Sequence, residues 1–163
     1  MSAVLHALDR WAAVDPDRQA LVGLDRAWTY AELRDEVAST ARALDAAFAD
    51  GDPDRPVALL LDNRPAWVVA DLALMRLGRP ALPLPGFFTA DQRAHALKDS
   101  GAAWLLHGQP GEVEIAGTPL SLQATGAAPV RLPTETAKIT YTSGSTGAPK
   151  GVCLSLDQME ATG

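Results

Sequence analysis

The first fifty residues carry apolar residues at spacings typical of two helices separated by a hairpin. Apolar positions recur at helical spacing over residues 4–11, which predicts an amphipathic helix that ends near Asp15. Two short β-prone stretches, 20–24 and 27–30, flank a polar pair and predict a hairpin. Thr29 and Glu32 then have the spacing of a capping box, so a second helix is expected over residues 30–48.

The next sixty residues alternate between strand patterns and helix patterns. The run 57–61 is apolar at every position, as in a strand that is covered on both faces. The same reasoning predicts two further strands and two helices: strands 81–84 and 103–106, and helices 63–78 and 89–100. Such alternation is typical of right-handed βαβ units. The expected fold class is therefore α/β, a three-layer open, mostly parallel sheet with helices on both faces.

The last third of the chain begins with a change in amino-acid composition, and two further β-prone stretches follow. Residues 108–133 are rich in Gly, Pro, Ala and Thr, and we interpret them as a connector with short β-prone stretches at 112–115 and 120–122. Residues 139–141 and 152–154 are β-prone and flank a polar segment, 142–151. This segment is the part of the sequence in which chemistry is expected.

Composition limits the class of protein. The 163 residues include 47% hydrophobic and 21% charged residues, as expected of one globular unit. The longest apolar stretch, 67–75, is far shorter than the ~18 residues of a membrane span, and no secretory segment opens the chain, so a cytoplasmic protein is expected. Cys153 is the single cysteine, which excludes an internal disulfide. The net charge of -6, from 14 basic and 20 acidic residues, argues against a nucleic-acid-binding surface.

The segment 142–151, TSGSTGAPKG, has the groups that hold a phosphate. Its glycines permit positive φ angles, so that successive backbone amides can converge on one anion. Small hydroxyl side chains add donors, and Lys150 adds a mobile positive charge. Hydrogen bonds to charged groups contribute about 1.5–3 kcal/mol each, so three or four would hold a triphosphate. The candidate phosphate-binding residues are Thr142, Ser143, Gly144, Ser145, Thr146, Gly147 and Lys150.

The segment has two alternative interpretations. Runs rich in Gly, Ser and Thr are more often turns or flexible linkers, and composition alone favours that interpretation; Lys150 shifts the balance towards phosphate. The segment is not a Walker A loop, because no glycine precedes a Gly-Lys-Ser or Gly-Lys-Thr triplet by four residues. A P-loop NTPase is therefore disfavoured.

The string 141–152, YTSGSTGAPKGV, resembles the signature loop of the AMP-forming acyl-adenylate ligases, the AMP-dependent synthetases and ligases. Two weaker patterns of that family precede it in the family's order, WTYAEL at 28–33 and LGRPALPL at 77–84. The stretch 83–102 is more similar to the acyl-CoA synthetase branch than to the amino-acid-activating branch, and Pro85 stands where amino-acid activators usually place aspartate. The resemblance spans nearly the whole chain but only the front part of the family's architecture.

The resemblance implies an enzyme that uses ATP with Mg²⁺ to convert a carboxylic acid, fatty or otherwise acyl, into acyl-AMP and passes the acyl group to a thiol such as coenzyme A. By the same resemblance, Thr142 to Gly147 and Lys150 would contact the β- and γ-phosphates. The family's adenine pocket, magnesium ligand and catalytic lysine correspond to sequence beyond Gly163, so no catalytic residue and no metal ligand is assigned here. Leu156 stands where relatives often carry histidine beside the acyl pocket, which leaves the acid open.

The end of the sequence shapes the expected domain organisation. Ser155 and Gln158 form another capping-box spacing, so a helix is only beginning when the chain stops. We expect an N-terminal α/β subdomain over 1–130 and, over 131–163, a strand, the phosphate loop, a strand and a helix start. The rest of an AMP-binding domain and a C-terminal domain would complete the enzyme, and the 163 residues alone would be inactive. The alternative is a non-catalytic nucleotide-binding or regulatory module on the same scaffold.

The remaining histidines and tryptophans are interpreted structurally. The histidines show no metal-ligand spacing and are expected at the surface or at strand ends: His6, His95 and His107. The tryptophans fall on predicted apolar faces and are expected to pack rather than to stack on bases: Trp11, Trp28, Trp67 and Trp104.

Overall fold

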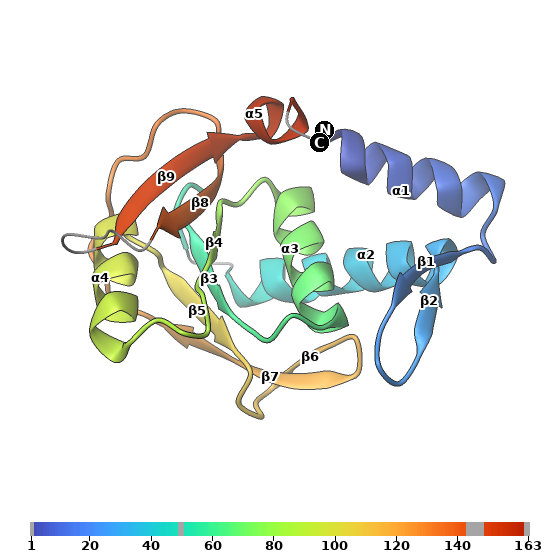
Figure 1. Ribbon diagram of the computed structural model, residues 1–163, viewed down its shortest axis with the longest axis horizontal. Coiled ribbons are helices and arrows are strands. Elements are labelled where there is room, and N and C mark those ends of the chain that lie inside the picture. Colours follow the sequence, from blue (N-terminus) through green and yellow to red (C-terminus); the bar gives the residue numbers. More distant parts are fainter. Residues whose placement is uncertain (1, 49–50, 143–148, 162–163) are drawn as a thin grey trace.

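The structure is a computed structural model that describes residues 2–48, 51–142 and 149–161. Helices and strands alternate through most of the chain (Figure 1). The elements are α1 (Ala3–Val14), β1 (Gln19–Val22), β2 (Ala27–Thr29), α2 (Tyr30–Ala47), β3 (Val57–Leu60), α3 (Pro65–Leu77), β4 (Ala81–Pro83), α4 (Ala90–Ser100), β5 (Trp104–His107), β6 (Val113–Ile115), β7 (Thr118–Ala124), β8 (Thr136–Thr142), β9 (Lys150–Ser155) and α5 (Leu156–Glu160).

Seven strands form one sheet in the order β6-β7-β5-β3-β4-β8-β9. The four central strands β5, β3, β4 and β8 are parallel, while β7 and β6 on one side and β9 on the other are antiparallel to their neighbours. The predicted α/β class is confirmed, and the connector expected over 108–133 adds an antiparallel hairpin, β6–β7, to the sheet.

Apolar clusters on opposite sides of the sheet account for its helical layers. Val57 and Leu59 of β3 face a cluster built with α2 and α3, whereas Ala58 faces a second cluster that includes Ala96 of α4. This division follows from the two-residue period of a strand. Figure 1 shows α2 and α3 away from α4, which lies by the β8–β9 hairpin. The expected three layers, with helices on both faces, are therefore present.

Local signals position the helix ends largely where they were expected. Capping boxes form at Thr29, Thr89 and Ser155, each with the two reciprocal hydrogen bonds at 3.2 and 2.9 Å. The helix expected from Asn63 begins at Pro65 instead; Arg64 occupies the N-cap and makes no side-chain capping bond, and Pro65 in the first turn sets this start. Among the described residues, no helix has the length and apolar character needed to cross a bilayer.

Arg55 ties the segment before β8 to the end of α4. Its guanidinium donates from Nε to the carbonyl of Gly101 at 3.0 Å and from Nη2 to the carbonyl of Ala127 at 2.6 Å. Thr125 adds a 2.5 Å hydrogen bond from its hydroxyl to the carbonyl of Ala102. These hydrogen bonds hold residues 125–127, which precede β8, against the end of α4 and the residue that follows it.

Candidate functional site

The candidate phosphate segment lies between two antiparallel strands, β8 and β9. Thr142, the last residue of β8, and Lys150, the first residue of β9, are opposite each other in the register of the pair. The structure therefore brings together the first and last of the seven candidate residues. The other five, Ser143, Gly144, Ser145, Thr146 and Gly147, lie outside the described residues.

Thr142 and Lys150 share one face of the hairpin and are exposed. Paired residues of antiparallel strands place their side chains on the same side, and Tyr141, one position earlier, points to the opposite side and is buried against α4. Lys150 forms no ion pair with any residue in the described part of the chain. Thr142 and Lys150 thus lie together on the exposed face of the hairpin.

The topology places this hairpin at the edge of the sheet where α/β proteins bind ligands. Strands β3, β4 and β8 are parallel, so their carboxyl ends meet at one edge. The helices that follow β3 and β4 cover opposite faces, which makes the carboxyl ends of these strands a topological switch point. The candidate segment leaves β8 at that edge, beside the end of β4.

Helix α4 contacts both strands at the base of the segment. The Tyr141 hydroxyl donates to Oδ2 of Asp99 at 2.6 Å, and the ring packs against Gly151, where an added Cβ would lie 2.9 Å from the Tyr141 Cζ. His95 Nε2 lies 3.1 Å from the carbonyl oxygen of Pro149. Sequence reasoning missed this arrangement and assigned His95 to the surface or to a strand end. The sequence signal for this arrangement is the four-residue spacing of His95 and Asp99, which places both side chains on one face of the helix.

Burial raises the pKa of Tyr141 well above its usual 10.0, and the hydrogen bond to the Asp99 carboxylate raises it further. The folded protein therefore keeps a proton that the unfolded chain releases above about pH 10, so the stabilising contribution is complete below that pH and is lost as pH rises towards the folded pKa.

We expect the stability advantage of the wild type over Tyr141→Phe to shrink above about pH 10, by up to about 1.4 kcal/mol per pH unit. Urea unfolding of both proteins between about pH 8 and about pH 11 measures this. A stability difference between the two proteins that stays constant over that pH range would contradict a raised pKa for Tyr141.

An ion pair supports β8 from its other face. Lys138 Nζ lies 2.7 Å from Oδ2 of Asp71 on α3, and the two side chains are only 17% and 11% exposed. The ammonium also lies 5.7 Å from the centre of the Trp67 ring. This contact between α3 and β8 was not predicted, because Asp71 lies within the otherwise apolar stretch 67–75 and belongs to no motif.

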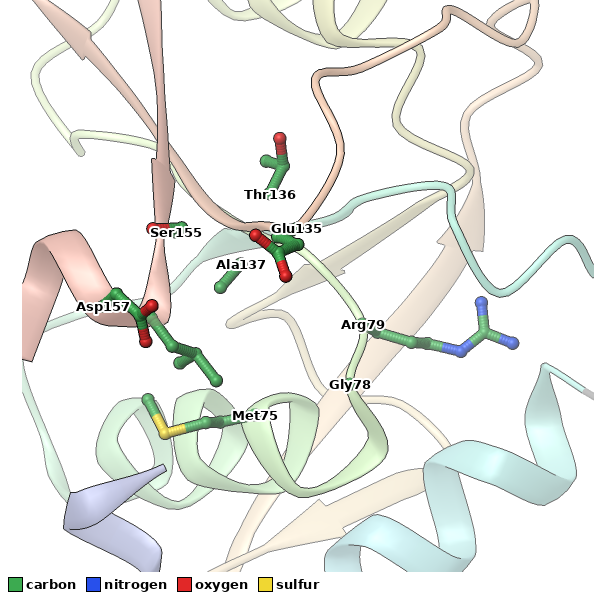
Figure 2. Close-up of a pocket in the computed structure, with 9 residues that line it drawn as sticks. Met75, Gly78, Arg79, Glu135, Thr136, Ala137, Ser155 and Asp157 are labelled. Carbon is green, nitrogen blue, oxygen red and sulfur yellow. The ribbon is translucent and has the colours of Figure 1, made fainter. Parts of the chain in front are cut away.

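A hollow of about 290 Å³ lies at the opposite end of the hairpin (Figure 2). It is lined by residues at the end of α3, the start of β8 and the start of α5, among them Met75, Thr136 and Leu156. In Figure 2 the Arg79 side chain points away from it; Nη1 of this residue donates to the carbonyl of Asp52. Because Thr136 and Ser155 are the far ends of β8 and β9, this hollow is separate from the candidate segment.

A mostly parallel α/β sheet with a glycine- and hydroxyl-rich segment at its carboxyl edge is typical of α/β proteins that bind nucleotides. A family model for AMP-binding enzymes matches residues 8–162. The chain belongs to the AMP-binding enzyme family, which confirms the resemblance seen in the signature string. The family uses ATP and a small-molecule acid, and its members are adenylate-forming ligases.

Relatives of known name and structure agree with this membership. The chain is 31% identical over 169 residues to the D-alanine–D-alanyl carrier protein ligase of Bacillus velezensis, covering 97% of this chain and 33% of the relative. It is similar to the N-terminal subdomain of Klebsiella oxytoca NpsA in complex with 3-hydroxybenzoyl-AMSN, with a TM-score of 0.71, 27% identity, and coverage of 95% and 41%. It is also similar to the Bacillus subtilis o-succinylbenzoate coenzyme A synthetase MenE in complex with AMP, with a TM-score of 0.68, 29% identity, and coverage of 89% and 40%.

These relatives include both a carrier-protein ligase named for an amino acid and a coenzyme A synthetase. They support an AMP-forming ligase as a whole rather than one branch of the family. The chain spans a third of the curated ligase and about two fifths of the solved chains. Within the described ranges, no group of three or more His, Cys, Asp or Glu side chains is placed to hold a metal ion.

Proposed function

We propose that this chain carries the ATP phosphate-binding hairpin of a ligase that activates a carboxylic acid as acyl-AMP and transfers the acyl group to a thiol, coenzyme A being the first candidate. The observation that carries the proposal is the pairing of Thr142 with Lys150 across the base of the signature segment, at the carboxyl edge of the parallel strands. This pairing places a hydroxyl and an ammonium on one face at the two ends of a segment rich in backbone amides.

The proposed reaction gives each group a defined task. A carboxylate oxygen attacks the α-phosphorus of ATP, the bond to the bridging oxygen breaks, and pyrophosphate leaves with that oxygen. The amides and hydroxyls of Thr142 to Gly147 would hold the β- and γ-phosphates in line with the attack, and Lys150 would stabilise the charge that develops on pyrophosphate. Magnesium would neutralise further phosphate charge. We place its ligands in the part of the family architecture beyond Gly163.

We propose an acid without an α-amino group, as in the acyl-CoA synthetase branch. Pro85, which stands where amino-acid activators usually place aspartate, follows β4 at the same sheet edge as Thr142. Phe87, two positions further along, is 79% exposed and offers apolar surface to an acyl chain. Pyrophosphate exchange with pairs of acids that differ only in an α-amino group tests this proposal. Preference for the amino acid of each pair would overturn it.

Replacing Lys150 is expected to weaken the use of ATP in the full-length protein. Lys150→Ala removes a charged hydrogen-bond donor worth about 1.5–3 kcal/mol, so KM for ATP should rise about tenfold to a hundredfold. Acid-dependent exchange of radiolabelled pyrophosphate into ATP provides the measurement. Lys98→Ala, which removes an exposed lysine of α4, is the matched control.

Two outcomes would count against the proposal. An unchanged KM for ATP in Lys150→Ala would contradict the proposal that the hairpin binds the phosphates of ATP. ATP binding by the full-length protein without exchange, over a broad panel of carboxylic acids, would instead favour the non-catalytic nucleotide-binding module.

A further inference from the structure

Two side chains of α4, one helical turn apart, hold the two ends of the phosphate segment. His95 and Asp99 are four residues apart and therefore lie on one helix face. Asp99 contacts Tyr141, the residue immediately before Thr142, and His95 contacts Pro149, the residue immediately before Lys150. One rigid helix thus fixes the chain both where it enters the segment and where it leaves.

The contact on the β8 side is short, and its tyrosine is buried. Tyr141 is buried, its hydroxyl lies 2.6 Å from Oδ2 of Asp99, and the carbonyl of Ala96 lies 3.4 Å away. The space above Gly151 is filled by the same ring, because a Cβ there would meet Tyr141 Cζ at 2.9 Å and the hydroxyl oxygen at 3.0 Å. Tyr141 therefore cannot swing towards β9, and Asp99 prevents it from moving away from α4.

In the contact on the β9 side, the donor and the acceptor of the hydrogen bond are fixed by chemistry. The carbonyl oxygen of Pro149 can only accept a hydrogen bond, so Nε2 of His95 must carry the hydrogen in this contact. Pro149 is buried, and the His95 ring stands edge-on to Tyr141, with centroids 6.4 Å apart and planes at 87°. The His95 and Tyr141 rings, one from each of the two hydrogen bonds, therefore also contact each other.

We infer that His95 and Asp99 are positioning residues for polyphosphate binding. By fixing Tyr141 and Pro149 they hold Thr142 and Lys150 at a set separation, so that these two residues lose less conformational freedom when they bind phosphate. The inference rests on the proposed function, because it assigns the ATP β- and γ-phosphates to this segment. A purely structural role for the same contacts would stabilise the fold without discriminating between nucleotides.

The test compares nucleotides that differ in their phosphate tails, in the full-length protein. His95→Leu and Asp99→Ala should each weaken ATP binding about twofold to tenfold, the range for loss of one hydrogen bond, while AMP binding changes by less than about twofold. His95→Gln keeps a donor and Asp99→Asn keeps an acceptor, and both should recover most of the ATP affinity. His6→Leu, at an exposed histidine of α1, is the matched control. Isothermal titration and a thermal unfolding midpoint are measured for every variant.

Equal weakening of ATP and AMP, or no change in either, would overturn the inference. Lys150→Ala in the same titrations separates the two proposals. If Lys150→Ala weakens ATP binding while the α4 variants do not, the role assigned to His95 and Asp99 is wrong and the phosphate-binding hairpin stands. If Lys150→Ala also leaves ATP binding unchanged, the proposed function and the inference fall together.

Discussion

Lys138→Met is expected to lower the free energy of unfolding by about 3 kcal/mol, at the lower end of the range for breaking a buried ion pair. The substitution keeps the length and apolar stem of the side chain but removes the ammonium 2.7 Å from Oδ2 of Asp71. The other oxygen, Oδ1, is buried and has no hydrogen-bond partner among the described residues. The variant therefore leaves a carboxylate, only 11% exposed, without the cation that stabilises its charge.

The double variant Asp71→Leu/Lys138→Met separates this cost from a loss of packing. Replacing both partners by apolar groups of similar volume removes the stranded charge, so stability should return to within about 1 kcal/mol of the wild type. Urea unfolding of the wild type, both single variants and the double variant gives the coupling energy between the two sites. A double variant as unstable as Lys138→Met would show that the cost comes from packing on Trp67 rather than from the unpaired carboxylate.

The elements that sequence reasoning located correctly are those whose signals are local. Each capping box joins residues three apart, and Gly78 and Gly101 end their helices in the left-handed conformation that a β-carbon disfavours. Such signals act before the tertiary fold exists, so they can be read without it. Asn63 is the exception, because Pro65 sets the start of α3 without a side-chain cap.

The contacts that shape the candidate site are between residues distant in sequence, and for that reason they were not predicted. Lys138 and Asp71 are 67 residues apart, His95 and Pro149 are 54 apart, and Asp99 and Tyr141 are 42 apart. Each depends on the order of strands in the sheet, which places β8 beside β4 and brings α4 beneath the hairpin. The signature string contains the residues proposed for phosphate binding, whereas His95 and Asp99, which contact the residues next to Thr142 and Lys150, belong to no motif.

Gly101→Ala is expected to lower the free energy of unfolding by about 2–5 kcal/mol, from two separate causes. Gly101 has a φ of +65°, where a β-carbon costs about 1–2 kcal/mol. The new methyl group would also lie 2.7 Å from the backbone nitrogen of Val130 and 3.0 Å from the carbonyl of Ala128, and overpacking of this kind costs about 1–3 kcal/mol. Backbone atoms on both sides, with Arg55 bonded to the Gly101 carbonyl, leave the site little room to relax.

Gly78→Ala is the matched control, because Gly78 also ends a helix, has a φ of +67°, and has nothing within 4 Å of the added β-carbon. It should lose only the conformational part, about 1–2 kcal/mol. The difference between the two variants in urea unfolding then measures how closely the segment before β8 packs on the end of α4. Equal losses in the two variants would show that residues 128–130 can move away from Gly101 at no cost. The position of β8 in the sheet would then not depend on the close packing at Gly101.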